Sequence, residues 1–426
     1  MDYKNLENFF TSKIGIFLIF YLSILIGFYF DENALGGAKH DFLHHYQFSK
    51  KFNVNFLEMF NRFGGEGMGT RNSPIFWIII AFLNKIFPIE VIRILNSLVS
   101  LLIGFCLYNC LKIRFKNQNE ITLILLSSTV FLSPTIRSLS IWPYNLIWGL
   151  LLFILSIYYF LKFKESFDNV VKFKYSLKLL FFLILSSYIH PSFAIFIIYY
   201  IFHLYIAFRL SKYLLYLIVF CLILSIPFFL YVYSTDVLFN FYHADGIDVN
   251  VTQSLNLSNK IIIISSMFLF FILPVINIKR SFAEIKLIKF KIVLIILFFG
   301  FINIYYFNFP YFEAGGFGGG FFHKLSNKLF DNNFLLYFVF ILSLMIMFGI
   351  FSKRVNNYIL FIALILSNPQ FTIYNKYFDP LIFILFLTLF EFDIKKHFFE
   401  KKYKFFQLFS LIVFFLIISL FKSYVL

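Results

Sequence analysis

The sequence predicts an all-α membrane protein that crosses the bilayer many times. Of its 426 residues, 61% are hydrophobic and only 14% are charged, whereas a soluble domain carries roughly a quarter charged residues. The hydrophobic residues form long blocks, such as 141–161 and 213–233, and a helix needs about 20 of them to cross the bilayer core. The blocks lack the alternation of barrel strands, so helices are the expected way to satisfy the backbone in lipid.

The apolar blocks, oriented by the lysines and arginines that follow them, predict about 13 transmembrane helices. They cover residues 14–30, 91–111, 121–134, 141–161, 179–190, 193–208, 213–233, 261–278, 292–309, 334–351, 358–373, 378–392 and 405–421. The apolar run 75–87 is short and contains Asn84 and Lys85, which favours an interfacial or re-entrant segment. Excluding this run places every strongly basic loop on the side of the N-terminus, which predicts an inner N-terminus and an outer C-terminus.

We expect a single transmembrane domain over residues 1–426, with a first outer loop at 31–90, a central span module at 91–278 and a C-terminal span module at 279–426. In the first outer loop, aromatic residues recur near helical spacing, at Phe42, Tyr46, Phe52, Phe56 and Phe60. This pattern predicts amphipathic juxtamembrane helices on the membrane surface. The net charge of +16 is explained by basic inner loops rather than by nucleic-acid binding. The three cysteines have no metal-site or disulfide spacing.

The first outer loop holds two candidate catalytic groups. Asp41 precedes His44 and His45 by three and four residues, so on a helix they share a face and the carboxylate could act as a base tuned by a histidine. The alternative is that these residues are simply solvated. Asp31 and Glu32, directly after the first span, are the rival carboxylate pair, and their alternative is a charged stop at the membrane exit.

Other polar residues of the outer loops are candidates for binding the phosphate of a donor or another part of a substrate. They are Lys50, Lys51, Arg71, Glu313, His323, Lys324, Lys376 and Asp379. Lysines and arginines at this depth also contact ordinary lipid phosphates, which is the alternative reading. A divalent cation could bind the outer carboxylates and histidines, although no ligand spacing indicates one, and no other cofactor is expected. The predicted span interiors hold almost no ionisable residues, which argues against transport.

The order of features up to Lys164 resembles the GT-C class of membrane glycosyltransferases, which includes protein O-mannosyltransferases and the lipid A aminoarabinose transferase. The matching segments are Phe30-Asp31-Glu32, Ser73-Pro74-Ile75 and the run Arg93–Ser97. The separation of the first two segments is longer than in the mannosyltransferases, and Ile75 replaces their second proline. The resemblance implies inverting transfer of a hexose or pentose from a polyprenyl-phosphate donor to a glycan, lipid or protein acceptor. It implies that Asp41 or Asp31 is the base, and we favour Asp41 because it begins the interfacial helix.

The resemblance also implies a bacterial cytoplasmic (inner) membrane and a cell-envelope role, with the active face outward. Two alternatives remain. A lipid or small-molecule transporter or flippase would need a polar path through the spans. An O-antigen-type polymerase or ligase usually carries one large late outer loop, whereas here the first outer loop is the largest.

Overall fold

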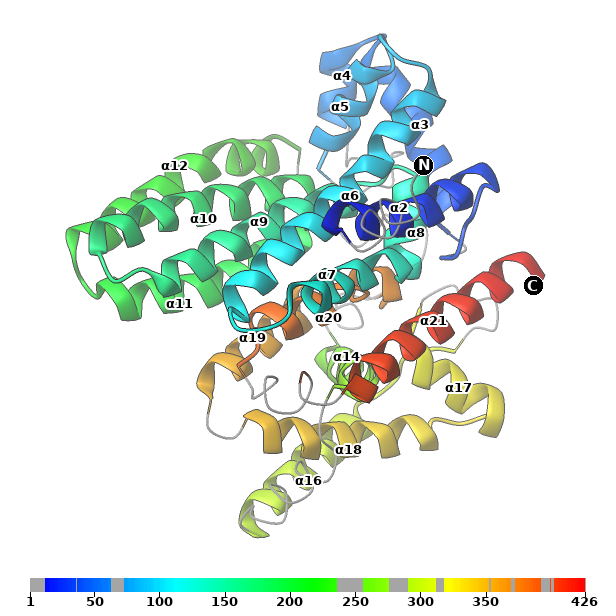
Figure 1. The fold of residues 1–426 in the computed structure, drawn as a ribbon, viewed down its shortest axis with the longest axis vertical. Coiled ribbons are helices and arrows are strands. Elements are labelled where there is room, and N and C mark those ends of the chain that lie inside the picture. Colours follow the sequence, from blue (N-terminus) through cyan, green and yellow to red (C-terminus); the bar gives the residue numbers. More distant parts are fainter. Residues whose placement is uncertain are drawn as a thin grey trace. The chain divides into compact units, whose positions relative to one another are not determined.

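The computed structural model describes residues 12–35, 37–62, 73–235, 256–275, 290–311, 318–351, 354–368, 372–391, 399 and 402–425. Within these ranges the regular structure is helical, and the strand-like pairing is limited to one isolated bridge between Gly318 and Ile373. The predicted all-α class is confirmed. The chain divides into two compact units, unit 1 with residues 1–248 and 412–426 and unit 2 with residues 249–411 (Figure 1). The division of the sequence at residues 90 and 278 stays a prediction.

In the part of the chain that the structure describes, six helices are long and apolar enough to cross a membrane, which supports an integral membrane protein. They are α6 (Ile89–Arg114), α9 (Asn145–Glu165), η2 with α11 (Pro191–Phe208), α12 (Lys212–Thr235), α18 (Phe334–Phe351) and α21 (Lys402–Val425). A seventh candidate is a pair bent by 65°, formed by α7 (Glu120–Ser128) with η1 (Thr129–Leu132) and then α8 (Pro134–Ile141). The predicted count of 13 spans is therefore not confirmed.

Several predicted spans form helices that are shorter than a bilayer crossing. Helices α2 (Lys13–Tyr29), α14 (Leu257–Ile272), α16 (Phe290–Tyr305) and α19 (Val355–Leu366) have 10 to 17 residues. Helix α20 (Leu381–Thr388) has 8 residues, and helix α5 (Ile75–Leu83), which covers the excluded apolar run, has 9. At about 1.5 Å per residue, the last two reach less than half of the roughly 30 Å core.

Helix α9 is central to unit 1 and packs against α6 and α10 (Asn169–Ile189). Gly149 on α9 allows close approach, because a Cβ atom there would lie 2.9 Å from the ring of Phe193. The buried backbone carbonyl of Gly149 accepts a hydrogen bond from Ser186 of α10 at 2.7 Å. Small residues of this kind let membrane helices pack closely in the absence of a hydrophobic driving force.

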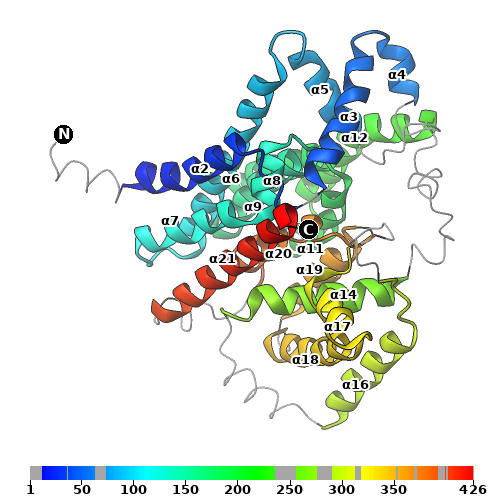
Figure 2. The same cartoon turned by 90° about the vertical axis from the view of Figure 1, so that its right-hand side faces the viewer.

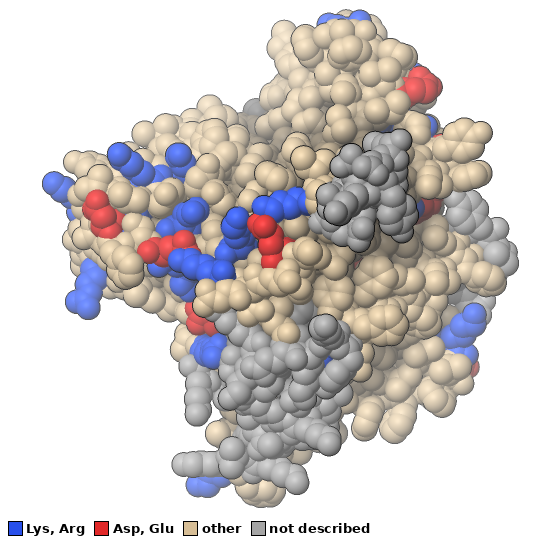
Figure 3. Space-filling model, viewed as in Figure 1, with Lys and Arg blue, Asp and Glu red and all other residues tan. Residues whose placement is uncertain are grey.

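The two ends of the unit 1 helices differ in charge. Helices α2 and α6 run antiparallel, since Phe17 meets the ring of Tyr108 edge to face while Tyr21 hydrogen bonds to Ser97. At the Tyr108 end, Glu120 binds Lys13 and Lys112, and nearby Lys116 pairs with Glu165 at 2.8 Å. Figure 3 shows Lys and Arg gathered mainly over the α9–α12 side of the unit. The other end of α2 leads to α3 (Ala38–Phe52), α4 (Phe56–Arg62) and α5, so the first loop lies away from the basic end (Figure 1).

Unit 2 is built around α14, which packs on α16, α17 (Gly320–Phe330), α18 and α20 (Figure 2). Phe268 of α14 contacts the rings of Phe351, Phe361 and Phe390. Ser343 of α18 donates a hydrogen bond to the carbonyl of Ser265 at 2.7 Å. Aromatic packing and buried polar contacts therefore join the helices of this unit.

Gly104 on α6 provides a test of the unit 1 packing. A Cβ atom at this position would lie 2.5 Å from the buried ring of Phe131, which is itself packed against Phe17 and Phe20. We expect Gly104→Ala to reduce the free energy of unfolding by about 1–3 kcal/mol because the core is overpacked. Gly37→Ala is the matched control, since nothing lies within 4 Å of its added Cβ. Equal thermal unfolding of both variants in detergent, followed by circular dichroism, would refute this packing.

Candidate functional site

The candidate site lies where α2 ends and the first loop begins. Asp31 adopts a left-handed backbone conformation with φ 52°, which Asp tolerates better than most residues. The main-chain N–H groups of Asp31 and Glu32 still bond back to Phe28 and Gly27. This turn ends α2 and sends two consecutive carboxylates to different partners.

The first carboxylate, that of Asp31, is held by a guanidinium group. Nη2 of Arg93 on α6 donates to Oδ1 of Asp31 at 2.8 Å, and Nζ of Lys39 lies 3.4 Å from Oδ2. About half of the Asp31 side chain is exposed (51%), whereas only 13% of Arg93 is. The carboxylate is therefore fixed by cations and still open to solvent or a ligand.

An indole ring orders these cations. The guanidinium of Arg93 lies 3.9 Å from the ring centre of Trp142, and the ammonium of Lys39 lies 4.9 Å from it. Arg93 also donates to the carbonyl of Ile141 at 3.1 Å. Stacking of a cation on an indole face is favourable by about 0.5–2 kcal/mol, so Trp142 holds both cations beside Asp31.

The second carboxylate, that of Glu32, forms a buried ion pair. Its two oxygens accept from Nε and Nη2 of Arg137 on α8 at 2.6 and 2.5 Å, and both side chains are more than nine-tenths buried. Arg137 also donates to the hydroxyl and the carbonyl of Ser23 at 2.9 Å each. The main-chain carbonyl of Glu32 accepts from the indole of Trp142 at 3.0 Å. This pair fixes the end of α2 against α8.

Gly27 makes room for the pair. A Cβ atom at Gly27 would lie 2.3 Å from Oε2 of Glu32 and 3.0 Å from Nη2 of Arg137. The absence of a side chain therefore lets the ion pair rest directly on the backbone of α2.

The charges around Asp31 also determine its ionisation. The hydrogen bond from Arg93 has the largest effect and lowers the pKa of Asp31. Burial raises this pKa by a smaller amount than the Arg93 hydrogen bond lowers it, and Lys39 lowers it further. Asp31 is therefore a carboxylate at neutral pH and accepts hydrogen bonds without donating any.

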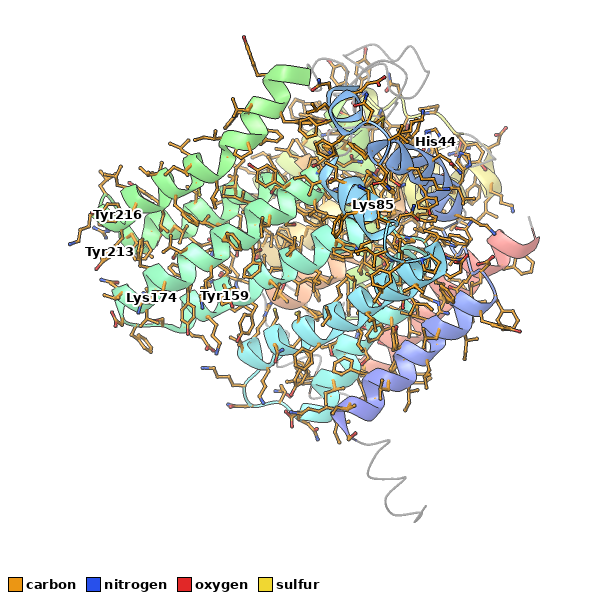
Figure 4. The ribbon with its side chains drawn as sticks, turned by 90° about the horizontal axis from the view of Figure 1, so that it is seen from above. His44, Lys85, Tyr159, Lys174, Tyr213 and Tyr216 are labelled. Atoms are coloured by element: carbon orange, nitrogen blue, oxygen red, sulfur yellow. The ribbon has the colours of Figure 1, made fainter. Side chains whose placement is uncertain are left out.

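Asp41, His44 and His45 all lie on α3, and the two histidines have different surroundings. His44 is exposed, stacks near His40 and contacts Phe48, at centroid distances of 6.5 and 4.8 Å. His45 is half-buried and lies 5.0 Å from Trp77 and 6.1 Å from Tyr144. Figure 4 shows His44 at the opposite side of unit 1 from Lys174, Tyr213 and Tyr216. The predicted cluster of Asp41 with both histidines stays a prediction.

The predicted phosphate-binding residues of the first loop lie at the end of α3 and beyond it. Lys50 and Lys51 are exposed, with their ammonium groups over the rings of Tyr46 and Phe48 at 4.5 and 5.1 Å. Arg71 lies outside the described residues. Phosphate binding by these residues stays a prediction.

The remaining predicted residues belong to unit 2. Of these, Glu313 lies outside the described residues. His323 and Lys324 are on α17. Lys376 lies in a short 3₁₀ turn with its ammonium 5.3 Å from the ring centre of Tyr374, and Asp379 is buried at the following cis Asp379–Pro380 bond. Across the described ranges, no three His, Cys, Asp or Glu side chains are grouped to hold a metal ion.

Comparison with known proteins gives no family assignment: no protein-family profile, curated protein or solved structure matches the chain. The residues and their geometry are therefore the basis for a functional proposal.

Four residues that bind Asp31, Glu32 or their partners were not among the predicted site residues. They are Lys39, Arg93, Arg137 and Trp142, of which Arg93 was noted only as part of a sequence run. One signal in the sequence could have identified Arg137, because it is the one charged residue between Glu120 and Lys162. An isolated arginine in such an apolar stretch needs a partner, and the acidic residues after the first span are candidates.

The buried pair can be tested by a double-mutant cycle. We expect Glu32→Leu or Arg137→Met alone to reduce the free energy of unfolding by about 3–5 kcal/mol, since each leaves a buried charge without its partner. The double variant should lose less than the sum of the two. Equilibrium unfolding in mixed detergent micelles measures these values.

The pair Lys116–Glu165, in which Lys116 is exposed and Glu165 is partly buried, supplies the control for this cycle. Glu165→Gln should change the same free energy by less than about 1 kcal/mol. Additive losses for Glu32 and Arg137 would contradict direct coupling between them.

Proposed function

We propose that this chain is an inverting membrane glycosyltransferase that uses a polyprenyl-phosphate sugar and an acceptor on the non-cytoplasmic face. The observation that carries the proposal is the half-exposed Asp31 carboxylate, held by Arg93 and Lys39 where an apolar helix ends. Such a group can accept a proton from an acceptor hydroxyl while cations beside it attract a phosphate. The resemblance of Phe30-Asp31-Glu32 and the following segments to the GT-C class supports the same reaction.

The depth of Asp31 suits a lipid-linked donor. The preceding aromatic residues Tyr29 and Phe30 are 82% and 66% exposed, and aromatic residues of membrane proteins concentrate at the lipid–water interface. The anomeric carbon of a polyprenyl-phosphate sugar lies just above the hydrocarbon. A carboxylate directly after this aromatic pair is therefore at the level where the reaction would occur.

In the proposed step, the acceptor hydroxyl oxygen forms a bond to the anomeric carbon and its proton passes to Asp31. The bond between the anomeric carbon and the phosphate oxygen breaks, and the polyprenyl phosphate leaves with the electron pair. Lys39, whose side chain is 43% exposed beside Asp31, is the cation that we assign to the departing phosphate. Arg93 is largely buried and has the positioning role, since it holds the carboxylate.

The charge distribution of unit 1 supports an outward active face. The cluster of Lys13, Lys112 and Glu120 lies at the opposite ends of α2 and α6 from Asp31 and Arg93. Basic residues at helix ends favour the cytoplasmic side, so the Asp31 end would face away from the cytoplasm. In a bacterium, the proposed reaction would then occur on the outer face of the cytoplasmic membrane.

The geometry favours Asp31 over Asp41 as the base. Asp31 has two cationic partners and a left-handed backbone that separates it from Glu32. Asp41 occupies the first turn of α3, and its charge there favours the helix N-terminus. We therefore assign the base to Asp31 and a structural role to Asp41, which reverses the narrow preference drawn from the sequence.

The assignment predicts a large loss of activity in Asp31→Asn. An amide cannot accept the proton, and removal of a general base typically lowers the rate by about 10²–10⁴-fold. The assay measures incorporation of labelled sugar from a panel of polyprenyl-phosphate hexoses and pentoses in membranes. Glu58→Gln is the control because Glu58 is an exposed carboxylate of the same loop that pairs with Asn55. Asp41→Asn should retain most of the activity, and full transfer by Asp31→Asn would sink the assignment.

A second prediction concerns the pH dependence of transfer. Arg93 lowers the pKa of Asp31 in the folded protein, so the base stays ionised, and transfer continues, down to a pH below the usual carboxyl range. Transfer is then lost as the pH falls through that lowered pKa. In Arg93→Met the pKa of Asp31 should rise, which moves the acidic limb of the rate profile to higher pH. An acidic limb at the same pH in Arg93→Met and wild type would show that another group controls it.

A further inference from the structure

A second group of polar residues lies inside unit 2, where the N-terminal end of α17 packs on α14. Helix α17 packs on α14, and its first residue, Gly320, lies against Ile263 and Met267 of α14. Asn308, which follows α16, binds Asn256 and Asn259 at the start of α14 through hydrogen bonds of 2.9–3.0 Å. The segment after α16 therefore borders both helix starts.

His323 is the first unusual member of this group. Its side chain is buried (1% exposed), and neither ring nitrogen has a hydrogen-bond partner among the described residues. The imidazole is surrounded by the rings of Phe307, Phe309 and Tyr311 at centroid distances of 5.4–6.0 Å. Burial, with a contribution from Lys324, lowers the pKa of His323 to about 4, so the ring is neutral at pH 7 and can donate one hydrogen bond.

The imidazole of His323 points back to the start of its own helix. Its Nδ1 atom occupies the space of a side chain on Gly319, where a Cβ atom would lie 2.4 Å away. Gly318, Gly319 and Gly320 have φ angles of 92°, 93° and 76°, which are accessible mainly to glycine. The N–H of Gly319 bonds to the carbonyl of Ile373. The first N–H groups of α17 have no acceptor within the helix and provide an anion site.

Lys260 supplies a positive charge in the same region. It lies one helical turn before Ile263, and it follows Asn259, which binds Asn308. Only 4% of Lys260 is exposed, and it has no ion pair with any described carboxylate. A buried ammonium group is costly without a counterion, so this position favours binding of an anion.

Exposed tyrosines lie next to this group in the sequence. Helix α16 ends at Tyr305 and Tyr306, which are 82% and 60% exposed. Exposed tyrosines at the end of an apolar helix are typical of the membrane interface. Asn308 and Phe309 follow directly, so the polar residues around Lys260 and His323 are near that level.

We propose that Lys260, His323 and the glycine-rich N-terminus of α17 form a binding site for a phosphate group. A lysine and a helix N-terminus with left-handed glycines suit the charge and the several acceptor oxygens of phosphate. The phosphate belongs either to a prenyl or other lipid phosphate or to free inorganic phosphate. The site lies wholly in unit 2, and its existence does not depend on sugar transfer at Asp31.

Calorimetry on the full chain in an uncharged detergent tests the site with three probes: farnesyl phosphate, farnesol and inorganic phosphate. We expect farnesyl phosphate to bind at least tenfold more tightly than farnesol. Binding of inorganic phosphate with similar affinity would assign the site to the free ion, and much weaker binding would assign it to a lipid phosphate. Equal affinity for farnesol and farnesyl phosphate would overturn the proposal without the need for any variant.

The variants Lys260→Met and His323→Leu should each weaken binding of the preferred phosphate at least tenfold. Lys260→Met removes a buried charge and keeps the length of the side chain, so we expect it to fold. Lys328→Met is the matched control, since Lys328 is exposed in the last turn of α17, and it should bind as wild type does. Unchanged affinity in Lys260→Met, or an equal loss in Lys328→Met, would show that phosphate is not held by this group.

Discussion

The buried ion pair between Glu32 and Arg137 constrains most of what surrounds it in unit 1. An arginine among apolar helices is tolerated when a carboxylate and carbonyl groups satisfy its donors, and Arg137 obtains these from Glu32 and Ser23. Gly27 must lack a side chain for the pair to form. With Glu32 facing inward, the left-handed turn at Asp31 directs the neighbouring carboxylate outward, to Arg93 and Lys39. The buried Glu32–Arg137 pair thus determines the direction of the half-exposed Asp31 carboxylate.

The bend between η1 and α8 is the second element of this arrangement. Ser133 caps α8 by accepting from the N–H of Ile136, and Pro134 follows at the start of the helix, a position where its missing N–H costs nothing. The resulting 65° bend ends one helix and begins another within the apolar region. Arg137 and Trp142 follow the bend, and both contact Glu32 at the end of α2.

Composition and hydrophobic blocks were enough to predict the helical class and several helices, and α18 begins and ends where the apolar block does. They failed for the region 378–392, where α20 starts only after Pro380 and has 8 residues. Apolar length alone does not show where polar turns such as the one at Asp379 interrupt a helix.

The candidate site was predictable only in part. Asp31 and Glu32 were named from the sequence, but their partners are 62 and 105 residues away, and side-chain spacing carries no information at that range. Asp41 was favoured because its neighbours at three and four residues are histidines, a purely local criterion. The structure gives His44 and His45 different surroundings, and the role of Asp41 stays a prediction.

All three tryptophans of the chain surround this region: Trp142 beside Arg93, Trp77 beside His45, and Trp148 bonded to Asn96. Indole emission depends on nearby charges and on the polarity around the ring, and this protein has no tryptophan elsewhere. The intrinsic fluorescence of the full chain is therefore a label-free optical signal from the first loop and its neighbouring helices. A ligand that displaces Lys39 or Arg93 from Trp142 would change this fluorescence on binding, even before its chemical identity is known.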